Sequence, residues 1–163
     1  MRTICGAVLL VWGLVPAAPA ATIILVRHAE QSGGMSADVP LTARGEERAR
    51  ELARVLRDAK IRAVFTAELR RTGQTAEPTA REFHIQPAII PAADTDALLE
   101  RLRVLPADDT VLVVGRASTI PAIVERLGGS AAPMAETEYD RMTVIVTRPN
   151  EKPAVLTLRY GAN

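Results

Sequence analysis

The residues best placed to do chemistry are Arg27 and His28, which directly follow the apolar run 23–26. Four apolar, mostly β-branched residues predict a strand buried on both faces, as in an inner strand of a parallel sheet. The carboxyl ends of such strands form the edge at which open α/β sheets bind ligands. A neutral imidazole is a competent nucleophile, and a guanidinium can hold a phosphate with two parallel hydrogen bonds. The pair therefore indicates a phosphate site, although a structural histidine gives the same local pattern.

Two more arginines follow the ends of other predicted strands. A strand is expected over 61–65, and Arg71 lies in the polar segment after it. The continuously apolar run 110–114 predicts another strand, after which Arg116 follows. Taken singly, most arginines are solvated surface charges. Cations at the ends of three separate strands favour a shared site for a phosphate over a site for a flat or apolar ligand.

The elements that must position these residues alternate along the chain. Apolar residues recur at helical spacing after Thr42, which is a typical N-cap, and three further helices are expected. Pro78 is expected to kink the second helix or force an irregular turn. The expected helices cover 42–58, 72–83, 94–104 and 118–127, and further strands are expected over 87–93, 143–147 and 154–160. Alternation of this kind predicts an α/β fold, a three-layer α/β/α sandwich with a mostly parallel central sheet.

The first twenty residues read as a secretory signal peptide. A basic start at Arg2 precedes an almost entirely apolar segment, and Ala18 and Ala20 form a small-residue cleavage site before Ala21. A membrane anchor needs about 20 apolar residues, and this run is shorter and interrupted by prolines. We therefore expect a signal peptide over 1–20, one α/β domain over 21–163, and a secreted or periplasmic protein.

Composition limits the classes of partner. Without Arg2 the chain has as many basic as acidic side chains, and no basic stripe interleaves with aromatic residues, so we expect no nucleic-acid partner. The single cysteine, Cys5, lies in the signal segment, so the mature core is expected to form without disulfides. Two histidines and no carboxylates at ligand spacing predict no metal site, and Gly33-Gly34 does not fit a nucleotide-binding loop. We expect no cofactor and no membrane partner after cleavage.

Four segments resemble motifs of one family, the histidine phosphatase superfamily of phosphoglycerate-mutase-like proteins. They occur in the family's order, and the small size of the chain resembles the compact phosphohistidine-phosphatase-like branch. The four segments are Leu25-Val26-Arg27-His28-Ala29-Glu30, Leu41-Thr42-Ala43-Arg44-Gly45, Arg71-Thr72-Gly73-Gln74-Thr75-Ala76 and Val111-Leu112-Val113-Val114-Gly115.

The resemblance implies that His28 attacks phosphorus and becomes phosphohistidine, while Arg27 and Arg71 bind the phosphate. Arg116 stands where the family has its second histidine. An arginine supplies charge and hydrogen-bond donors but never gives up its proton, so this substitution is expected to favour phosphate binding over turnover. Three guanidiniums beside His28 are expected to lower its pKa and keep the imidazole neutral.

The leaving group needs a proton donor, and the family uses a carboxylate for this role. Asp38 is the first candidate, since its loop is expected to cover the edge of the sheet. Glu30 is the second and Asp94 the third. Each of them is also a plausible loop carboxylate, and Asp94 a helix cap. His84 follows a helix and is expected at the surface.

Three hypotheses follow from the sequence. The first is an exported enzyme that hydrolyses small phosphomonoesters or phosphoramidates through phosphorylated His28. The second is a non-catalytic protein that binds inorganic phosphate or a small phosphorylated ligand, in which Arg116 favours affinity over chemistry. The third is a purely structural secreted domain, which the motif residues Arg27, His28 and Arg71 disfavour.

Overall fold

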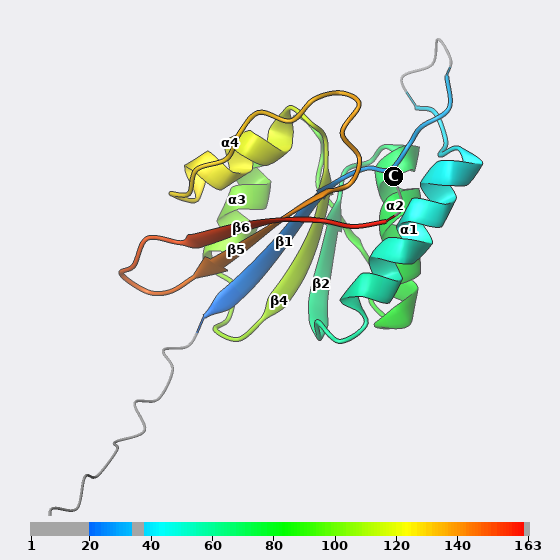
Figure 1. The fold of residues 1–163 in the computed structure, drawn as a ribbon. Helices are drawn as coiled ribbons and strands as arrows, with labels where there is room; N and C mark the ends of the chain where they lie inside the picture. Colours follow the sequence, from blue (N-terminus) through cyan, green and yellow to red (C-terminus); the bar gives the residue numbers. More distant parts are fainter. Residues whose placement is uncertain (1–19, 34–37, 162–163) are drawn as a thin grey trace, which may run out of the picture.

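The computed structural model describes residues 20–33 and 38–161, so the predicted signal peptide lies outside the described residues except for Ala20. Strands and helices alternate through most of this part (Figure 1). In chain order they are β1 (Ala21–Arg27), α1 (Ala43–Leu56), β2 (Ile61–Thr66), α2 (Arg70–Glu82), β3 (Ala88–Ile89), α3 (Thr95–Arg103), β4 (Thr110–Gly115), α4 (Thr119–Arg126), β5 (Arg141–Thr147) and β6 (Ala154–Arg159).

The strands form one sheet in the order β3-β2-β4-β1-β5-β6. β1 pairs with β4 in parallel, β4 with β2, and β2 with β3, whereas β5 runs antiparallel to both of its neighbours. β1 therefore lies inside the sheet, which is why its sequence is continuously apolar rather than alternating. The predicted α/β class with a mostly parallel sheet is confirmed.

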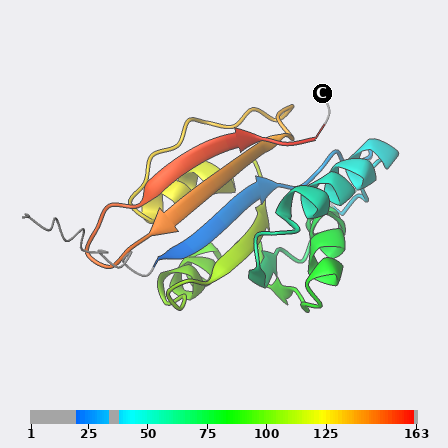
Figure 2. The ribbon, with the colours of Figure 1, turned by 60° about the horizontal axis from the view of Figure 1, so that its bottom comes forward.

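Helices cover both faces of this sheet (Figures 1 and 2). On one face Leu52 of α1 and Ala76 of α2 pack with Ile24 of β1. On the other face Leu99 of α3 packs in the same cluster as Ile23. Adjacent residues of β1 point to opposite faces, so each face receives half of the strand's apolar side chains. These two cores make the three-layer sandwich that the sequence predicts.

The edge next to β2 differs from the prediction. The strand expected over 87–93 is only two residues long, Ala88–Ile89. Pro91 has no backbone N–H for the ladder, so the pairing ends before it. Pro78, in contrast, lies inside α2, whose 13 residues continue on both sides of it.

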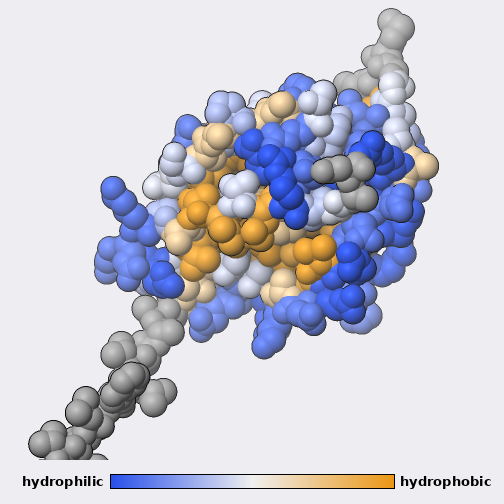
Figure 3. Space-filling view, viewed as in Figure 1, coloured by the Kyte–Doolittle hydropathy of each residue, from blue (hydrophilic) through white to orange (hydrophobic). Residues whose placement is uncertain are grey.

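The opposite edge leaves part of the sheet uncovered. Leu156 and Leu158 of β6 are 56% and 42% exposed, and an apolar area extends over this side of the sheet (Figure 3). The helices α1 and α2 cover the parallel strands, and this uncovered area lies beyond them (Figure 2). In the part of the chain that the structure describes, every helix is too short or too polar to cross a membrane.

Candidate active site

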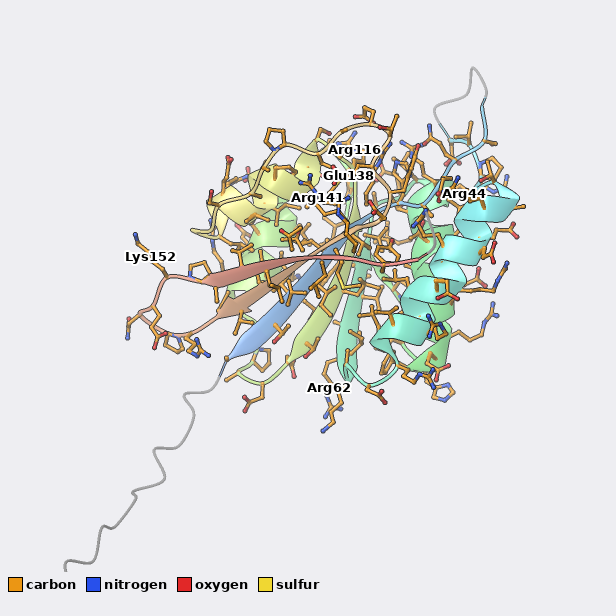
Figure 4. The ribbon with its side chains drawn as sticks, viewed as in Figure 1. Arg44, Arg62, Arg116, Glu138, Arg141 and Lys152 are labelled. Atoms are coloured by element: carbon orange, nitrogen blue, oxygen red, sulfur yellow. The ribbon has the colours of Figure 1, made fainter. Side chains whose placement is uncertain are left out.

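The carboxyl ends of β1 and β4 meet at one edge of the sheet. Arg27 is paired in register with Gly115, and the His28 N–H donates to the Gly115 carbonyl at 3.0 Å. The next residues after this pair, His28 and Arg116, therefore have neighbouring backbones. Figure 4 shows Arg116 at the opposite end of the sheet from Arg62, which lies near the start of β2. This edge is the ligand-binding edge of an open α/β sheet.

His28 is buried, with 3% of its surface exposed. Its Nδ1 lies 2.9 Å from the Ala29 carbonyl oxygen, and since a carbonyl only accepts, Nδ1 carries the proton. The lone pair is then on Nε2. The pKa of His28 is lowered to about 4, chiefly by burial and also by the charges of Arg27 and Arg71, while the hydrogen bond to the Ala29 carbonyl and the charge of Glu136 act in the opposite direction. The imidazole is therefore neutral and nucleophilic at neutral pH.

The Leu-Thr-x-x-Gly segment fixes the loop that follows His28. Thr42 caps α1 by accepting from the Gly45 N–H at 3.1 Å, and its own N–H donates to the Glu30 carbonyl at 2.9 Å. A Cβ on Gly45 would lie 2.2 Å from that same carbonyl oxygen. Glycine is therefore needed here for the close approach of α1 to the loop.

The segment 71–76 fixes the same loop from α2. The Ala29 N–H donates to Thr75 Oγ1 at 2.9 Å, and that hydroxyl donates to the Arg71 carbonyl at 2.7 Å. Gln74 Oε1 accepts from the Leu41 N–H at 2.9 Å. The sequence analysis gave Gln74 and Thr75 no role. Their positions three and four residues after Arg71 place all three on one helix face, which is the signal that points to them.

Arg27 is buried and organises the loop 135–139 between α4 and β5. Its Nη1 donates to the carbonyls of Ala135 and Glu136 at 3.3 and 2.6 Å, and its Nη2 donates to the Glu136 carboxylate at 2.9 Å. The Tyr139 ring lies 4.1 Å from the guanidinium carbon and 6.2 Å, centre to centre, from the His28 ring. No motif or periodicity in the sequence points to this loop.

Arg71 and Arg116 differ in their relation to His28. Arg71 lies in the first turn of α2, and its charge acts on His28. The Arg116 guanidinium instead donates through Nη2 to the Ala92 carbonyl at 3.1 Å. Glu68 accepts from the Ala92 N–H, and its pKa is lowered first by backbone hydrogen bonds and also by the charge of Arg116. The structure thus brings Arg27, His28 and Arg71 together, whereas the Arg116 side chain contacts the loop after β3.

This arrangement corrects the expected cause of the low pKa of His28. Three guanidiniums were expected to lower it, but burial is the largest cause, and the arginine charges that contribute are those of Arg27 and Arg71. Arg116 lines a small cavity of about 40 Å³ instead, together with Phe65, Ile90 and Leu98 among others.

Glu30 is held by two arginines. Arg48 binds both carboxylate oxygens at 2.8–3.0 Å, and Arg44 Nε lies 3.1 Å from one of them. Burial alone would raise the pKa of Glu30, but these hydrogen bonds and charges outweigh it and hold the pKa below its usual value. A carboxylate held in its charged form is a poor proton donor, which disfavours Glu30 as the acid.

Asp38 and Asp94 both contact helix starts. Asp38 Oδ1 accepts from the Arg70 N–H at 2.6 Å, so this carboxylate binds the first turn of α2, whose own N-cap Leu69 has no side-chain acceptor. Asp94 caps α3 by accepting from the Ala97 N–H at 2.9 Å. Both carboxylates therefore bind a backbone N–H at the start of a helix.

Within residues 20–33 and 38–161, no three His, Cys, Asp or Glu side chains are placed to share a metal ion. His84 is exposed at the end of α2, with a positive φ of 55°. Its position agrees with the surface location that the sequence predicts.

Comparison with known proteins identifies the fold. Residues 23–94 match the model of the histidine phosphatase superfamily (branch 1). A Nakamurella multipartitia protein assigned as phosphohistidine phosphatase SixA superposes with a TM-score of 0.66 at 24% identity, over 89% of this chain and 99% of that chain. The protein histidine phosphatase SixA complexed with tungstate gives 0.66 at 18%, over 85% and 96%. Mycobacterial glucosyl-3-phosphoglycerate phosphatase gives 0.63 at 13%, over 86% and 98%.

We find no match among curated protein sequences. The family model covers β1 to the start of α3, and the solved structures extend the similarity in fold over most of the chain. The resemblance predicted from the four motifs is confirmed: the chain has the fold of the histidine phosphatase superfamily and is similar to its compact phosphohistidine-phosphatase-like members.

Proposed function

We propose that this protein is a phosphatase that hydrolyses phosphomonoesters or phosphoramidates through a phosphohistidine intermediate on His28. The observation that carries the proposal is the state of His28, which is buried and neutral, with its proton on Nδ1 and its lone pair on Nε2. Arg27 and Arg71 are the cations beside it. The SixA protein solved with tungstate shows that a relative in fold accepts a tetrahedral oxyanion.

The residues support a two-step reaction. Nε2 of His28 forms a bond to phosphorus while the bond from phosphorus to the leaving group breaks, and Arg27 and Arg71 hold the phosphoryl oxygens. The Ala29 carbonyl keeps the proton on Nδ1 and stabilises the positive charge that develops on the ring. Water then attacks phosphorus, inorganic phosphate leaves, and His28 returns to its neutral form.

The test is to trap the intermediate. Wild-type protein mixed with ³²P-labelled acyl or aryl phosphate and quenched in alkali should carry an acid-labile, alkali-stable label. The variant His28→Asn should lose both the label and turnover. Turnover that survives in His28→Asn would refute a nucleophilic role for His28.

A second function is favoured by the contact of Arg116 with Ala92. With the guanidinium held there and no histidine at this position, phosphate binding by Arg27 and Arg71 without efficient turnover also fits the site. In this alternative the protein is a non-catalytic, phosphate-binding relative of the phosphatases. Arg116→His should then raise kcat on an activated aryl phosphate from near zero, while the phosphate affinity that Arg27 and Arg71 supply is kept. An active wild type that loses turnover in Arg116→His would exclude this alternative and make Arg116 a working residue.

We also propose that the protein acts outside the cytoplasm on a small phosphorylated substrate. The support is the sequence of residues 1–20, with its basic start, apolar run and alanine-rich end. The mature protein would then begin at Ala21, the first residue of β1.

A further inference from the structure

On one edge of the Arg27 guanidinium, only one of the two nitrogens has a hydrogen-bond partner among the described residues. Its Nη1 is bound to backbone carbonyls, while its Nε is buried and has no hydrogen-bond partner among the residues described. The Nη2 on the same edge as Nε donates to one oxygen of Glu136. Arg48 shows how such an edge is filled, because its Nε and Nη2 together bind both oxygens of Glu30. The Nε–Nη2 edge of Arg27 thus matches an oxyanion with two available oxygens.

Glu136 is the group that a ligand can displace from this edge of the Arg27 guanidinium. Its side chain is 80% exposed, whereas the Arg27 side chain is 4% exposed and lies against the Tyr139 ring at 4.1 Å. A phosphoryl group that takes both Nε and Nη2 therefore displaces the Glu136 carboxylate and leaves Arg27 in place. Glu136 lies close to the reacting centre, because its backbone carbonyl also accepts from Arg27 Nη1 at 2.6 Å and its charge acts on His28.

We propose that Glu136 is the proton donor to the leaving group, and that phosphate binding at Arg27 releases it for this role. The inference rests on the proposed phosphatase function. Once separated from Arg27 and placed beside a phosphate dianion, the carboxyl group takes up a proton from solvent, since the nearby negative charge disfavours its ionised form. Its exposure gives it direct access to water.

The proton transfer completes the first chemical step. As Nε2 of His28 forms its bond to phosphorus, the electron pair of the breaking P–O or P–N bond goes to the leaving atom, which takes the proton from Glu136. The neutral leaving group departs and Glu136 becomes a carboxylate. In the second step this carboxylate accepts a proton from the water that attacks phosphohistidine. Inorganic phosphate then leaves, Glu136 releases its proton to solvent, and its carboxylate binds Nη2 of Arg27 again.

Two other carboxylate candidates have hydrogen-bond partners that the substrate does not need. Glu30 is bound by Arg44 and Arg48, and Asp38 binds the start of α2. The partner of Glu136, by contrast, is the arginine that the substrate itself needs. This difference makes Glu136 the better donor of the three.

The experiment compares Glu136→Gln with the control Glu125→Gln, which changes an exposed glutamate on α4. Each protein is assayed on phenyl phosphate, whose leaving group needs a proton, and on 2,4-dinitrophenyl phosphate, whose leaving group does not. Glu136→Gln should lower kcat/KM for phenyl phosphate about 100-fold and change kcat/KM for the dinitrophenyl ester by less than about 3-fold. The control should leave both values unchanged.

Each other result overturns the role of Glu136. Equal losses on the two esters would show that Glu136 only supports the loop 135–139, and no loss on either would place the acid elsewhere. In both cases a phosphohistidine trapped from the dinitrophenyl ester would leave the proposed function intact. A wild type that forms no phosphohistidine and cleaves neither ester would refute the proposed function, and the donor role with it.

Discussion

His28→Asn tests whether the buried imidazole is neutral in the folded protein. The pKa of His28 is about 4 in the fold, against an ordinary value of 6.5 for the unfolded chain. Between these two pH values the unfolded chain binds a proton at His28 that the folded protein does not. The contribution of neutral His28 to the free energy of unfolding is therefore fully present above pH 6.5 and is lost as pH falls toward 4. The full difference corresponds to about 3 kcal/mol, of which about 2 kcal/mol is lost between pH 7 and pH 5.

The assay is urea unfolding of wild type and His28→Asn at pH 7 and pH 5. Carboxylates such as Glu30 and Glu138 also titrate in acid, but they are present in both proteins and cancel in the comparison. Wild type should therefore lose about 2 kcal/mol more than the variant between the two pH values. Equal losses in the two proteins would show that His28 is charged or solvated in the fold, which would refute the neutral nucleophile.

Further predictions concern the loop after His28 and the chain terminus. Gly45→Ala should lower the free energy of unfolding by about 1–3 kcal/mol in urea titrations, whereas Gly73→Ala, with open space for its Cβ, should not. Thr75→Val should cost about 1–2 kcal/mol because it leaves the Ala29 N–H unsatisfied. Thr79→Val, on the same helix at a buried hydroxyl without a partner among the described residues, should cost nothing. Glu30→Gln should lower the melting temperature but reduce kcat/KM for phenyl phosphate less than Glu136→Gln does. N-terminal sequencing of the protein recovered outside the cytoplasm should give a start near Ala21; an intact Met1 start in a membrane fraction would contradict this prediction.

The sequence predicted the fold well because its main signals are local. An inner parallel strand such as β1 is continuously apolar, and the helices on the two faces are amphipathic, so each element is visible within a short window. The short β3 was overestimated because apolar residues continue past the last hydrogen-bonded pair, Thr66–Ile89. Pairing at a sheet edge depends on the neighbouring strand, which no local pattern contains.

The candidate site was predicted only where its signals are local in the sequence. Arg27, His28 and Arg71 lie within motifs next to strand ends, and the structure brings them together. Glu136 and Tyr139 lie more than a hundred residues from Arg27 in an irregular loop, so no periodicity could pair them with it. The direction of the Arg116 side chain depends on the Ala92 carbonyl in a separate loop. Long-range loop contacts of this kind are fixed only by the assembled fold.

The central place of β1 has a consequence for the order in which the protein folds. This first strand pairs with β4 and β5, so neither of its neighbours exists until the chain has been made past residue 110, and the second pairing waits for residue 147. Arg48, which holds the loop after His28, also donates to the Tyr160 carbonyl near the end of the chain. Contacts this distant in sequence favour slow folding. The central strand of the sheet therefore lacks its last partner until nearly all of the chain has been made.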